Sequence, residues 1–431
     1  MLALLLGIGS VGVLTTGTVM YSRFLYLGVL LTVGSWLWMR WAIRGLRVSR
    51  NARVQRANVG DVFEEKFEVA NDSRVILPWI EIINQSLIPF AAGSRLFTYM
   101  KGHQKLTYLA RTWLTHRGGF PLGPTRISTG DPFGFFNTSK EISPAQTLVV
   151  LPVIFEIRSF LFPPGLLPGG QVIRRKSSDI TPHAAGVREY VHGDAMKRIH
   201  WPTSARRDRL MVKEFEQDPQ AEIWLYLDSQ KDVHYAKPHQ IEEVPVEVLM
   251  FKKRPKFKLP PSTLEYSISI TASLAHYFIG QRRAVGYVSA GQTFSVHSAE
   301  CSGRQEAKIL ETLAFVEANG NLSIAALVAV QASQLPQGSS VILITPTVRP
   351  DLIHAVDDLQ RRFLRPVVVL LDVETFGGVH GTDNLLLSLR ERRIPVIVIK
   401  CDADLTQALS VVPTTIYTQD SSLWQTPVLS Q

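Results

Sequence analysis

The chain has 431 residues, enough for two or three domains, and 46 Lys and Arg against 37 Asp and Glu leave a formal net charge of +9. A hydrophobic content of 45% and a mean hydropathy of +0.08 are high for a purely water-soluble protein, so we expect part of the chain to contact lipid. Only two cysteines occur, Cys301 and Cys401, which excludes a disulfide framework and favours a reducing compartment.

Two apolar runs open the chain. Leu2 to Met20 carries no charge, and Phe24 to Met39 follows after a short break. Each run can cross a bilayer core of about 30 Å, the second being somewhat short. A cleaved signal peptide is the alternative, but no basic residue precedes the first run and no small-residue cleavage site follows it. The sequence therefore predicts a transmembrane helical hairpin over residues 1–45.

Basic residues beyond the second run predict its orientation. Arg40, Arg44, Arg47 and Arg50 lie there, against the single Arg23 between the runs. Because Lys and Arg accumulate on the cytoplasmic side of membrane spans, we expect a multi-pass protein of the cell membrane with cytoplasmic domains. The lipid bilayer would then take up much of the positive charge, which makes nucleic acid a less favoured partner.

Residues 58–158 alternate apolar and polar side chains between turn-forming Gly, Asn and Pro. Runs such as VFEEKFEVAN (62–71) and KLTYLARTWLTH (105–116) predict the strands of a small antiparallel β domain, sandwich-like or barrel-like. Residues 116–136 are rich in glycine and aromatic side chains. We interpret them as turns and core aromatics rather than as a ligand site.

Residues 159–220 combine a Pro- and Gly-rich linker with a strongly charged segment, residues 187–216, and residues 221–431 show another pattern. Continuous apolar runs, such as EIWLYLD (222–228) and PVVVLLD (366–372), alternate with amphipathic ones. This pattern predicts an α/β domain with a doubly wound parallel sheet. Ligands of such sheets bind at the carboxyl ends of strands, where Asp228 and Asp372 lie. No GxGxxG or P-loop motif occurs, so a nucleotide cofactor is not predicted.

The charged segment could be catalytic. His192, Asp194 and His200 could act as a general-base or metal cluster. However, the two histidines are eight residues apart across an expected Gly-Asp turn, and Ser204 lacks the setting of a hydrolase nucleophile. We therefore assign no catalytic residue to this segment.

We favour a structural role for the charged segment, as a polar joint between two domains. In this interpretation Asp194 caps a short helix that begins at the next residue. Ile199 and Trp201 are apolar anchors, and Arg188 and Arg206 pair with nearby carboxylates.

The charged segment, with Asp131, Pro132, Phe133 and Gly134 upstream, resembles the bacterial and archaeal family called domain of unknown function 58. Within the segment the resemblance is carried by Arg188, Glu189, Tyr190, Gly193, Asp194, Ile199, Trp201, Ala205 and Arg206. It is strong only over about residues 115–230. It implies a membrane anchor, a von Willebrand factor A-like α/β domain and a MoxR-type AAA+ ATPase as partner, but it implies no activity.

The resemblance also bears on metal binding. Domains of the von Willebrand type hold Mg²⁺ with Asp-x-Ser-x-Ser after the first strand, and here Asp228, Gln230 and Asp232 occupy those positions. Both serines are thus replaced, and Lys231 adds an opposing positive charge. We expect a degenerate site that binds no metal.

Residues 232–261 form a basic insert. Five cations, Lys252, Lys253, Arg254, Lys256 and Lys258, alternate with Phe251, Phe257 and prolines. Such a pattern can bind single-stranded nucleic acid, contact a membrane or a partner, or form a solvated loop, which we favour.

These patterns favour a membrane-anchored, cytoplasm-facing binding or assembly protein that works with a MoxR-type AAA+ ATPase and is not an enzyme. Two alternatives remain open. One is a membrane-bound enzyme with its site near Asp228 and Asp372. The other is a nucleic-acid-binding membrane protein that uses Lys252 to Lys258.

Overall fold

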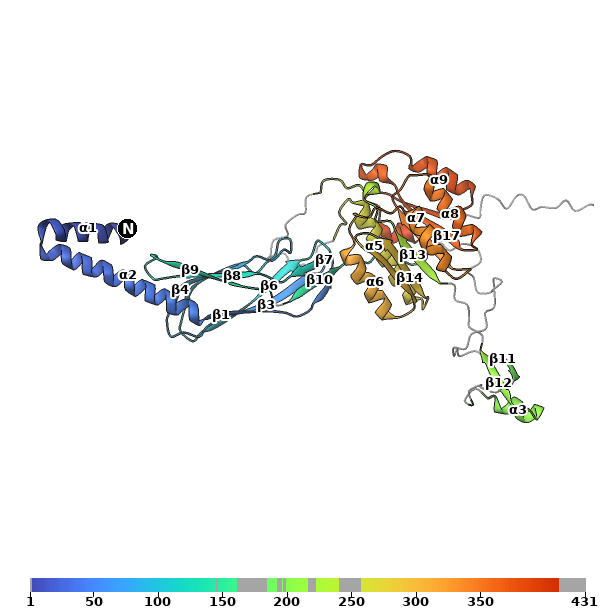
Figure 1. Cartoon of the computed structure of the whole chain (residues 1–431), viewed down its shortest axis with the longest axis horizontal. Helices are drawn as coiled ribbons and strands as arrows, with labels where there is room; N and C mark the ends of the chain where they lie inside the picture. Colours follow the sequence, from blue (N-terminus) through green and yellow to red (C-terminus); the bar gives the residue numbers. More distant parts are fainter. Residues whose placement is uncertain are drawn as a thin grey trace, which may run out of the picture. The chain divides into compact units, whose positions relative to one another are not determined.

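The computed structural model describes residues 2–144, 146–160, 184–191, 196, 199–215, 222–239 and 257–410. The chain divides into two compact units (Figure 1). Unit 1 contains Met1–Val153, Pro238–Pro260 and Leu310–Phe315. Unit 2 contains Ile154–Lys237, Pro261–Ile309 and Val316–Gln431.

Unit 1 begins with two helices, α1 (Leu2–Thr16) and α2 (Val19–Gly45), which lie side by side and run in opposite directions (Figure 1). Glycines on α1 allow the helices to approach closely. A Cβ on Gly9 would lie 3.2 Å from the backbone of Leu25, and one on Gly12 would collide with the ring of Tyr21. The inner face of α1 is therefore packed against α2.

The predicted transmembrane hairpin is wrong. Among the residues that the structure describes, no helix is both long enough and apolar enough to cross a membrane. Helix α1 has 15 residues, about 22 Å, against a hydrocarbon core of about 30 Å. Helix α2 is longer, but Arg23 and Arg40 restrict its uncharged part to residues 24–39, about 24 Å. The predicted multi-pass location in a membrane fails for the same reason.

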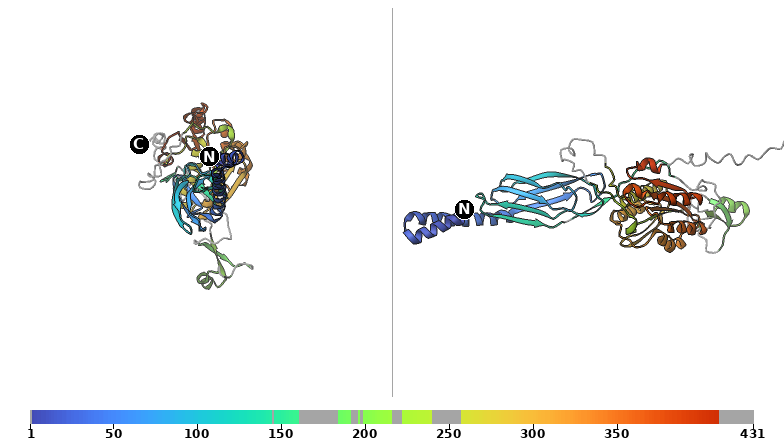
Figure 2. Two further views of the ribbon diagram at one scale, coloured as in Figure 1. Left: turned by 90° about the vertical axis from the view of Figure 1, so that its left-hand side faces the viewer. Right: turned by 90° about the horizontal axis from the view of Figure 1, so that it is seen from above.

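In the described part of unit 1, ten strands form three sheets, ordered β1-β3-β6, β2-β10-β7 and β5-β4-β8-β9. Figure 2 shows the longer strands lying alongside one another. The strands are β1 (Leu46–Ala52), β2 (Arg56–Asn58), β3 (Val62–Asn71), β4 (Leu77–Asn84), β5 (Arg95–Met100), β6 (Lys105–Trp113), β7 (Gly118–Pro121), β8 (Thr125–Gly130), β9 (Asn137–Ile142) and β10 (Thr147–Leu151).

The sequence predicted a purely antiparallel β domain, but in the structure β10 pairs parallel with β2. Alternation with a period of two identifies a strand, but it does not tell whether the neighbouring strand runs parallel or antiparallel. That direction depends on the path of the chain between the two strands. Alternate residues of β3, such as Phe63 and Phe67, are buried and form the core together with side chains of β4, β6 and β10.

Unit 2 is built on one six-stranded sheet with the order β15-β14-β13-β16-β17-β18. The strands are β13 (Ile223–Leu227), β14 (Val285–Ala290), β15 (Phe294–Glu300), β16 (Ser340–Thr345), β17 (Arg365–Leu371) and β18 (Val396–Ile399). The sheet is mixed rather than wholly parallel, because β15 pairs antiparallel with β14. Only residues 291–293 connect these two strands, which is too short for a parallel crossover.

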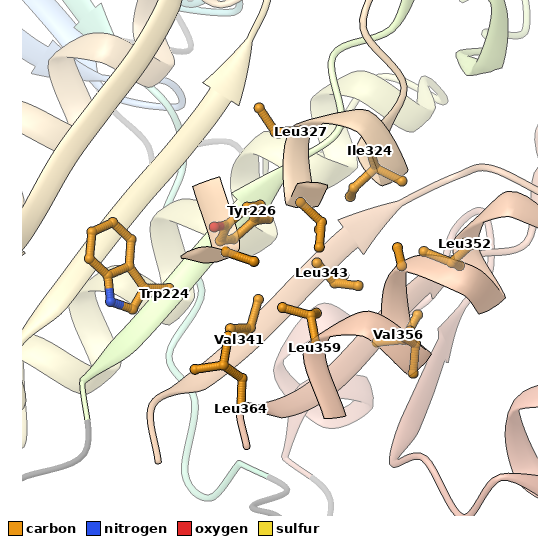
Figure 3. Packing of buried hydrophobic residues seen from close by; sticks show 14 of the residues in the cluster. Trp224, Tyr226, Ile324, Leu327, Val341, Leu343, Leu352, Val356, Leu359 and Leu364 are labelled. Carbon is orange, nitrogen blue, oxygen red and sulfur yellow. The ribbon is translucent and has the colours of Figure 1, made fainter. Parts of the chain in front are cut away.

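Helices cover both faces of this sheet. They are α5 (Thr263–Gly280), α6 (Gly303–Phe315), α7 (Ile324–Gln331), α8 (Asp351–Arg361), α9 (Thr382–Glu391) and α10 (Leu405–Leu409). Trp224 and Tyr226 of β13 pack with side chains of α7 and α8, such as Leu327 and Val356, in one continuous apolar cluster (Figure 3). Because alternate strand residues face opposite ways, Leu225 and Leu227 are buried on the other face, where α5 lies.

Candidate functional site

The carboxyl edge of the six-stranded sheet has a point where strand order reverses. From β13 the chain first builds β14 and β15 on one side and then β16, β17 and β18 on the other. Ligands of doubly wound sheets bind at such a switch point. Asp228 follows β13 and Thr345 ends β16, so the two residues meet there.

Asp228 is held by the protein itself at this edge. Its side chain is 1% exposed. The Thr345 hydroxyl donates to Oδ2 at 2.6 Å, and the backbone N–H of Gln230 donates to Oδ1 at 3.1 Å. Burial raises the pKa of Asp228 to about 6, against the lowering effect of these two hydrogen bonds, and the negative charge of Asp351 adds to the rise.

His234 supports the same loop. Burial lowers the pKa of His234 to about 4, so the ring is neutral at pH 7. Its Nε2 lies 3.0 Å from the carbonyl oxygen of Asp228, and its Nδ1 lies 3.0 Å from the hydroxyl of Thr263. A carbonyl only accepts, so Nε2 carries the proton and Nδ1 accepts from Thr263. The ring therefore ties the loop after β13 to the start of α5.

The other predicted residues of this edge lie in different environments. Gln230 is 7% exposed and forms an isolated parallel β-bridge with Gly320 through the backbone. Asp232 is exposed. Asp372 follows β17, and β16 lies between β13 and β17, so the two acids of the predicted enzyme site stand on strands about 10 Å apart. In the part of the chain that the structure describes, no group of three His, Cys, Asp or Glu residues could hold a metal ion.

The charged segment forms a small element of its own, drawn in green in Figure 1. Strands β11 (Ala184–Glu189) and β12 (Met211–Phe215) pair antiparallel, and α3 (Trp201–Arg207) lies between them in sequence. His200 caps α3, because its Nδ1 accepts from the backbone N–H of Thr203 at 3.3 Å. The N–H of Met211 donates to the Ser204 hydroxyl at 2.8 Å, which joins α3 to β12.

The family-resemblance residues occupy different places in this element. Ile199 is buried as expected for an anchor, but Trp201 is 65% exposed and does not anchor the fold. Glu189 pairs with Arg209, with the two side chains 2.8 Å apart. Arg188 lies opposite Val212 in the pairing of β11 with β12, and the N–H of Tyr190 donates to the carbonyl of Leu210. Ala205 and Arg206 are exposed on α3. His192, Gly193, Asp194 and Ala195 lie outside the described residues.

Four exposed apolar side chains lie in this element, and the sequence did not predict their exposure. Val191 is 62% exposed, Met196 73%, Trp201 65% and Leu210 46%. Backbone hydrogen bonds hold them in one element: the N–H of Tyr190 donates to the carbonyl of Leu210, and that of His200 donates to Met211. The signal in the sequence was the presence of these apolar residues within a strongly charged segment. Their spacing fits neither a helix nor a strand, so they could not be assigned to a buried face.

The turn between β8 and β9 also presents an aromatic side chain. Asp131 is 2% exposed, and its carboxylate accepts from the N–H groups of Phe133 and Phe136 at 3.0 and 2.6 Å. Pro132 lies within this turn, and Gly134 has the positive φ of 73° that closes it. Phe133 stacks on Phe135 and is 60% exposed. This loop aromatic is therefore not a core residue, contrary to the sequence interpretation.

The arginines expected at a membrane surface differ in environment. Arg50 lies on β1 with a side chain 9% exposed, and it pairs with Glu65, which is 1% exposed, at 2.6 Å. Arg47 pairs with Asp72 at the surface, and Arg40 lies 5.5 Å from the ring centre of Trp36. Arg50 is thus part of the interior of unit 1. The prediction that it contacts a membrane surface is wrong.

Most of the basic insert lies outside the described residues, including Lys252, Lys253, Arg254 and Lys256. Phe257, at its described end, packs edge to face on Trp113 of β6, with ring centres 6.2 Å apart. The ring thereby belongs to the core of unit 1.

Comparison with known proteins supports the family resemblance. Residues 186–251 match the model of a family described as a protein of unknown function, DUF58. The uncharacterized protein YeaD of Bacillus subtilis (strain 168) is 24% identical over 319 residues, which make up 72% of this chain and 70% of that protein.

Similarity to solved structures is weak. The CARDB domain of the PF1109 protein from Pyrococcus furiosus is 13% identical, covers 24% of this chain and 91% of its own, and has a TM-score of 0.17. A GH20 exo-β-N-acetylglucosaminidase from Vibrio harveyi is 8% identical, and the match covers 80% of this chain and 59% of that protein, with a TM-score of 0.18. Neither score indicates a shared fold.

Proposed function

We propose that this chain is a binding or assembly protein whose charged segment docks on a partner protein. The exposure of Trp201 carries the proposal: an indole that is 65% exposed, on a short capped helix, is costly to leave in water unless something covers it. Tryptophan is among the residues enriched in interface hot spots. Met196, Val191 and Leu210 are further exposed apolar side chains of the same element.

The arrangement at Asp228 supports binding over catalysis. Its carboxylate is engaged by Thr345 and Gln230 within the protein. The side chain is also 1% exposed, so a substrate has little access to the carboxylate. The strand order, with one antiparallel edge strand, supports the further proposal that unit 2 is von Willebrand factor A-like.

The family resemblance implies the partner, a MoxR-type AAA+ ATPase. A direct test uses the purified full chain and a MoxR-type ATPase from the same organism, with affinity measured by biolayer interferometry. We expect Trp201→Ala to weaken binding about tenfold or more, as for an interface hot spot. Phe363→Ala is the matched control, because Phe363 is 71% exposed in unit 2.

Two outcomes would overturn this proposal. One is no binding of the unmodified chain to the ATPase at protein concentrations of tens of micromolar. The other is equal binding by the Trp201 variant and the unmodified chain, which would leave the exposed indole without a role in docking.

A further inference from the structure

The two N-terminal helices use only part of their apolar surface on each other. On α2, Gly28, Ser35 and Ala42 are buried. On α1, Leu4, Ile8 and Val11 are 54–65% exposed. A helix that is apolar on all sides is normally covered on all sides, so the outer faces lack an apolar neighbour among the described residues.

One exposed row on α2 has the spacing of a helix-packing seam. Tyr26 is 70% exposed, Leu30 69%, Val33 49% and Leu37 37%. The steps along the chain are four, three and four residues, a mean of about 3.7, which is close to the helical repeat of 3.6, so the four side chains form one stripe along the helix. Arg23 and Arg40 flank the row, and no charged residue interrupts it.

The exposed area is sufficient for a stable interface. Fifteen large apolar side chains of α1 and α2 are at least 37% exposed. Together they offer on the order of 1,500 Å², about twice the roughly 800 Å² that a standard interface buries on each partner. Covering half of this surface would be enough.

The composition of the row favours a second copy of the chain as the occupant. Interfaces between identical subunits are more apolar than transient ones, and two-fold dimers pair the same surface on both subunits. The row has no charge with which to select a different partner. We propose that α1 and α2 of two copies pack through these outer faces into a four-helix assembly, an interface separate from the docking element of the proposed function.

Sedimentation equilibrium of the full chain without detergent tests the proposal. We expect a dimer for the unmodified chain and a monomer for the double variant Leu30→Glu, Val33→Glu, because two carboxylates would enter the seam. Leu387→Glu, at a 59% exposed position of α9, should remain dimeric.

A cross-linking experiment keeps the proposal falsifiable if the charged variant fails to fold. Leu30→Cys in a Cys301→Ser, Cys401→Ser background should be joined by a bismaleimide, whereas Leu387→Cys in the same background should not. A monomeric unmodified chain, or equal cross-linking at both positions, would overturn it. So would a chain that stays monomeric alone but sediments with phosphatidylcholine vesicles through the same row, because lipid would then be the occupant.

Discussion

Thr345 donates a 2.6 Å hydrogen bond to the buried carboxylate of Asp228, across the two strands where the order of the six-stranded sheet reverses. The two residues are 117 positions apart in sequence. At the place where doubly wound sheets bind ligands, this chain instead links its own strands. The bond explains how a buried acid is tolerated at the edge of an apolar sheet.

Removing this hydrogen bond should destabilise unit 2. Thr345→Val keeps the shape of the side chain but leaves one carboxylate oxygen without its donor, and such a loss costs about 1–3 kcal/mol. Thr345→Ser, which keeps the hydroxyl, should cost clearly less. Urea denaturation at pH 7.5 measures both, and equal losses for the two variants would show that the hydroxyl is not what matters.

The stability of the chain should fall as pH rises through the titration of Asp228. Its pKa is raised from 3.8 to about 6, mainly by burial, so the folded state binds a proton more tightly than the unfolded state. The resulting stabilisation is present below about pH 4 and is lost as pH rises through 6, a change of about 3 kcal/mol.

Asp228→Asn should abolish this part of the pH dependence, because an amide does not titrate. Asp232→Asn, at an exposed position of the same loop, should leave it intact. The measurement is the free energy of unfolding between pH 4 and 8. Parallel curves for the unmodified chain and Asp228→Asn would contradict the assignment.

Arg50 and Glu65 should behave as a buried ion pair. Arg50→Met leaves Glu65, which is 1% exposed, as an uncompensated charge, and we expect a loss of about 3–5 kcal/mol. The double variant Arg50→Met, Glu65→Leu should recover most of it. Arg47→Ala removes a pair whose arginine is 78% exposed and should cost less than about 1 kcal/mol. A double variant as unstable as Arg50→Met would show that burial of the charge is not the cause.

Trp201 and its neighbour Ile199 should differ in their effects on stability. Ile199 is 5% exposed, so Ile199→Ala should open the charged segment, at a cost of about 2–4 kcal/mol. Trp201→Ala should change stability by less than about 1 kcal/mol, because little of the indole is buried. Hydrogen exchange of the His200 and Met211 amides, both bonded within the element, reports its opening. Equal loss of protection in both variants would mean that Trp201 is structural after all.

Local sequence patterns located many elements of this protein. The period of two in VFEEKFEVAN corresponds to β3, and the continuous run EIWLYLD contains β13, whose five residues are all buried. Both patterns reflect which side of a strand meets water. Strands β1, β5 and β15 were among those not predicted, because they bury at most one residue each and so carry few apolar side chains on a buried face.

The N-terminal prediction failed for a different reason. Mean hydropathy at residues 1–45 is high, but hydropathy does not measure the length of the uninterrupted apolar helix. The structure ends α1 at Thr16 and places Arg23 and Arg40 within α2. Arg50 was also misjudged, because its sequence position beside other arginines gave no sign of Glu65 on the neighbouring strand.

Local sequence was enough to predict the main strands, from the alternation of apolar and polar side chains, and to show the family resemblance of residues 187–216. Three features became visible only in the folded chain: the hydrogen bond between Asp228 and Thr345, the ion pair between Glu65 and Arg50, and the exposure of Trp201. Periodicity reflects neighbours only two to four positions away in the sequence. Whether a polar group is satisfied or an indole is covered depends instead on residues brought together from distant parts of the chain.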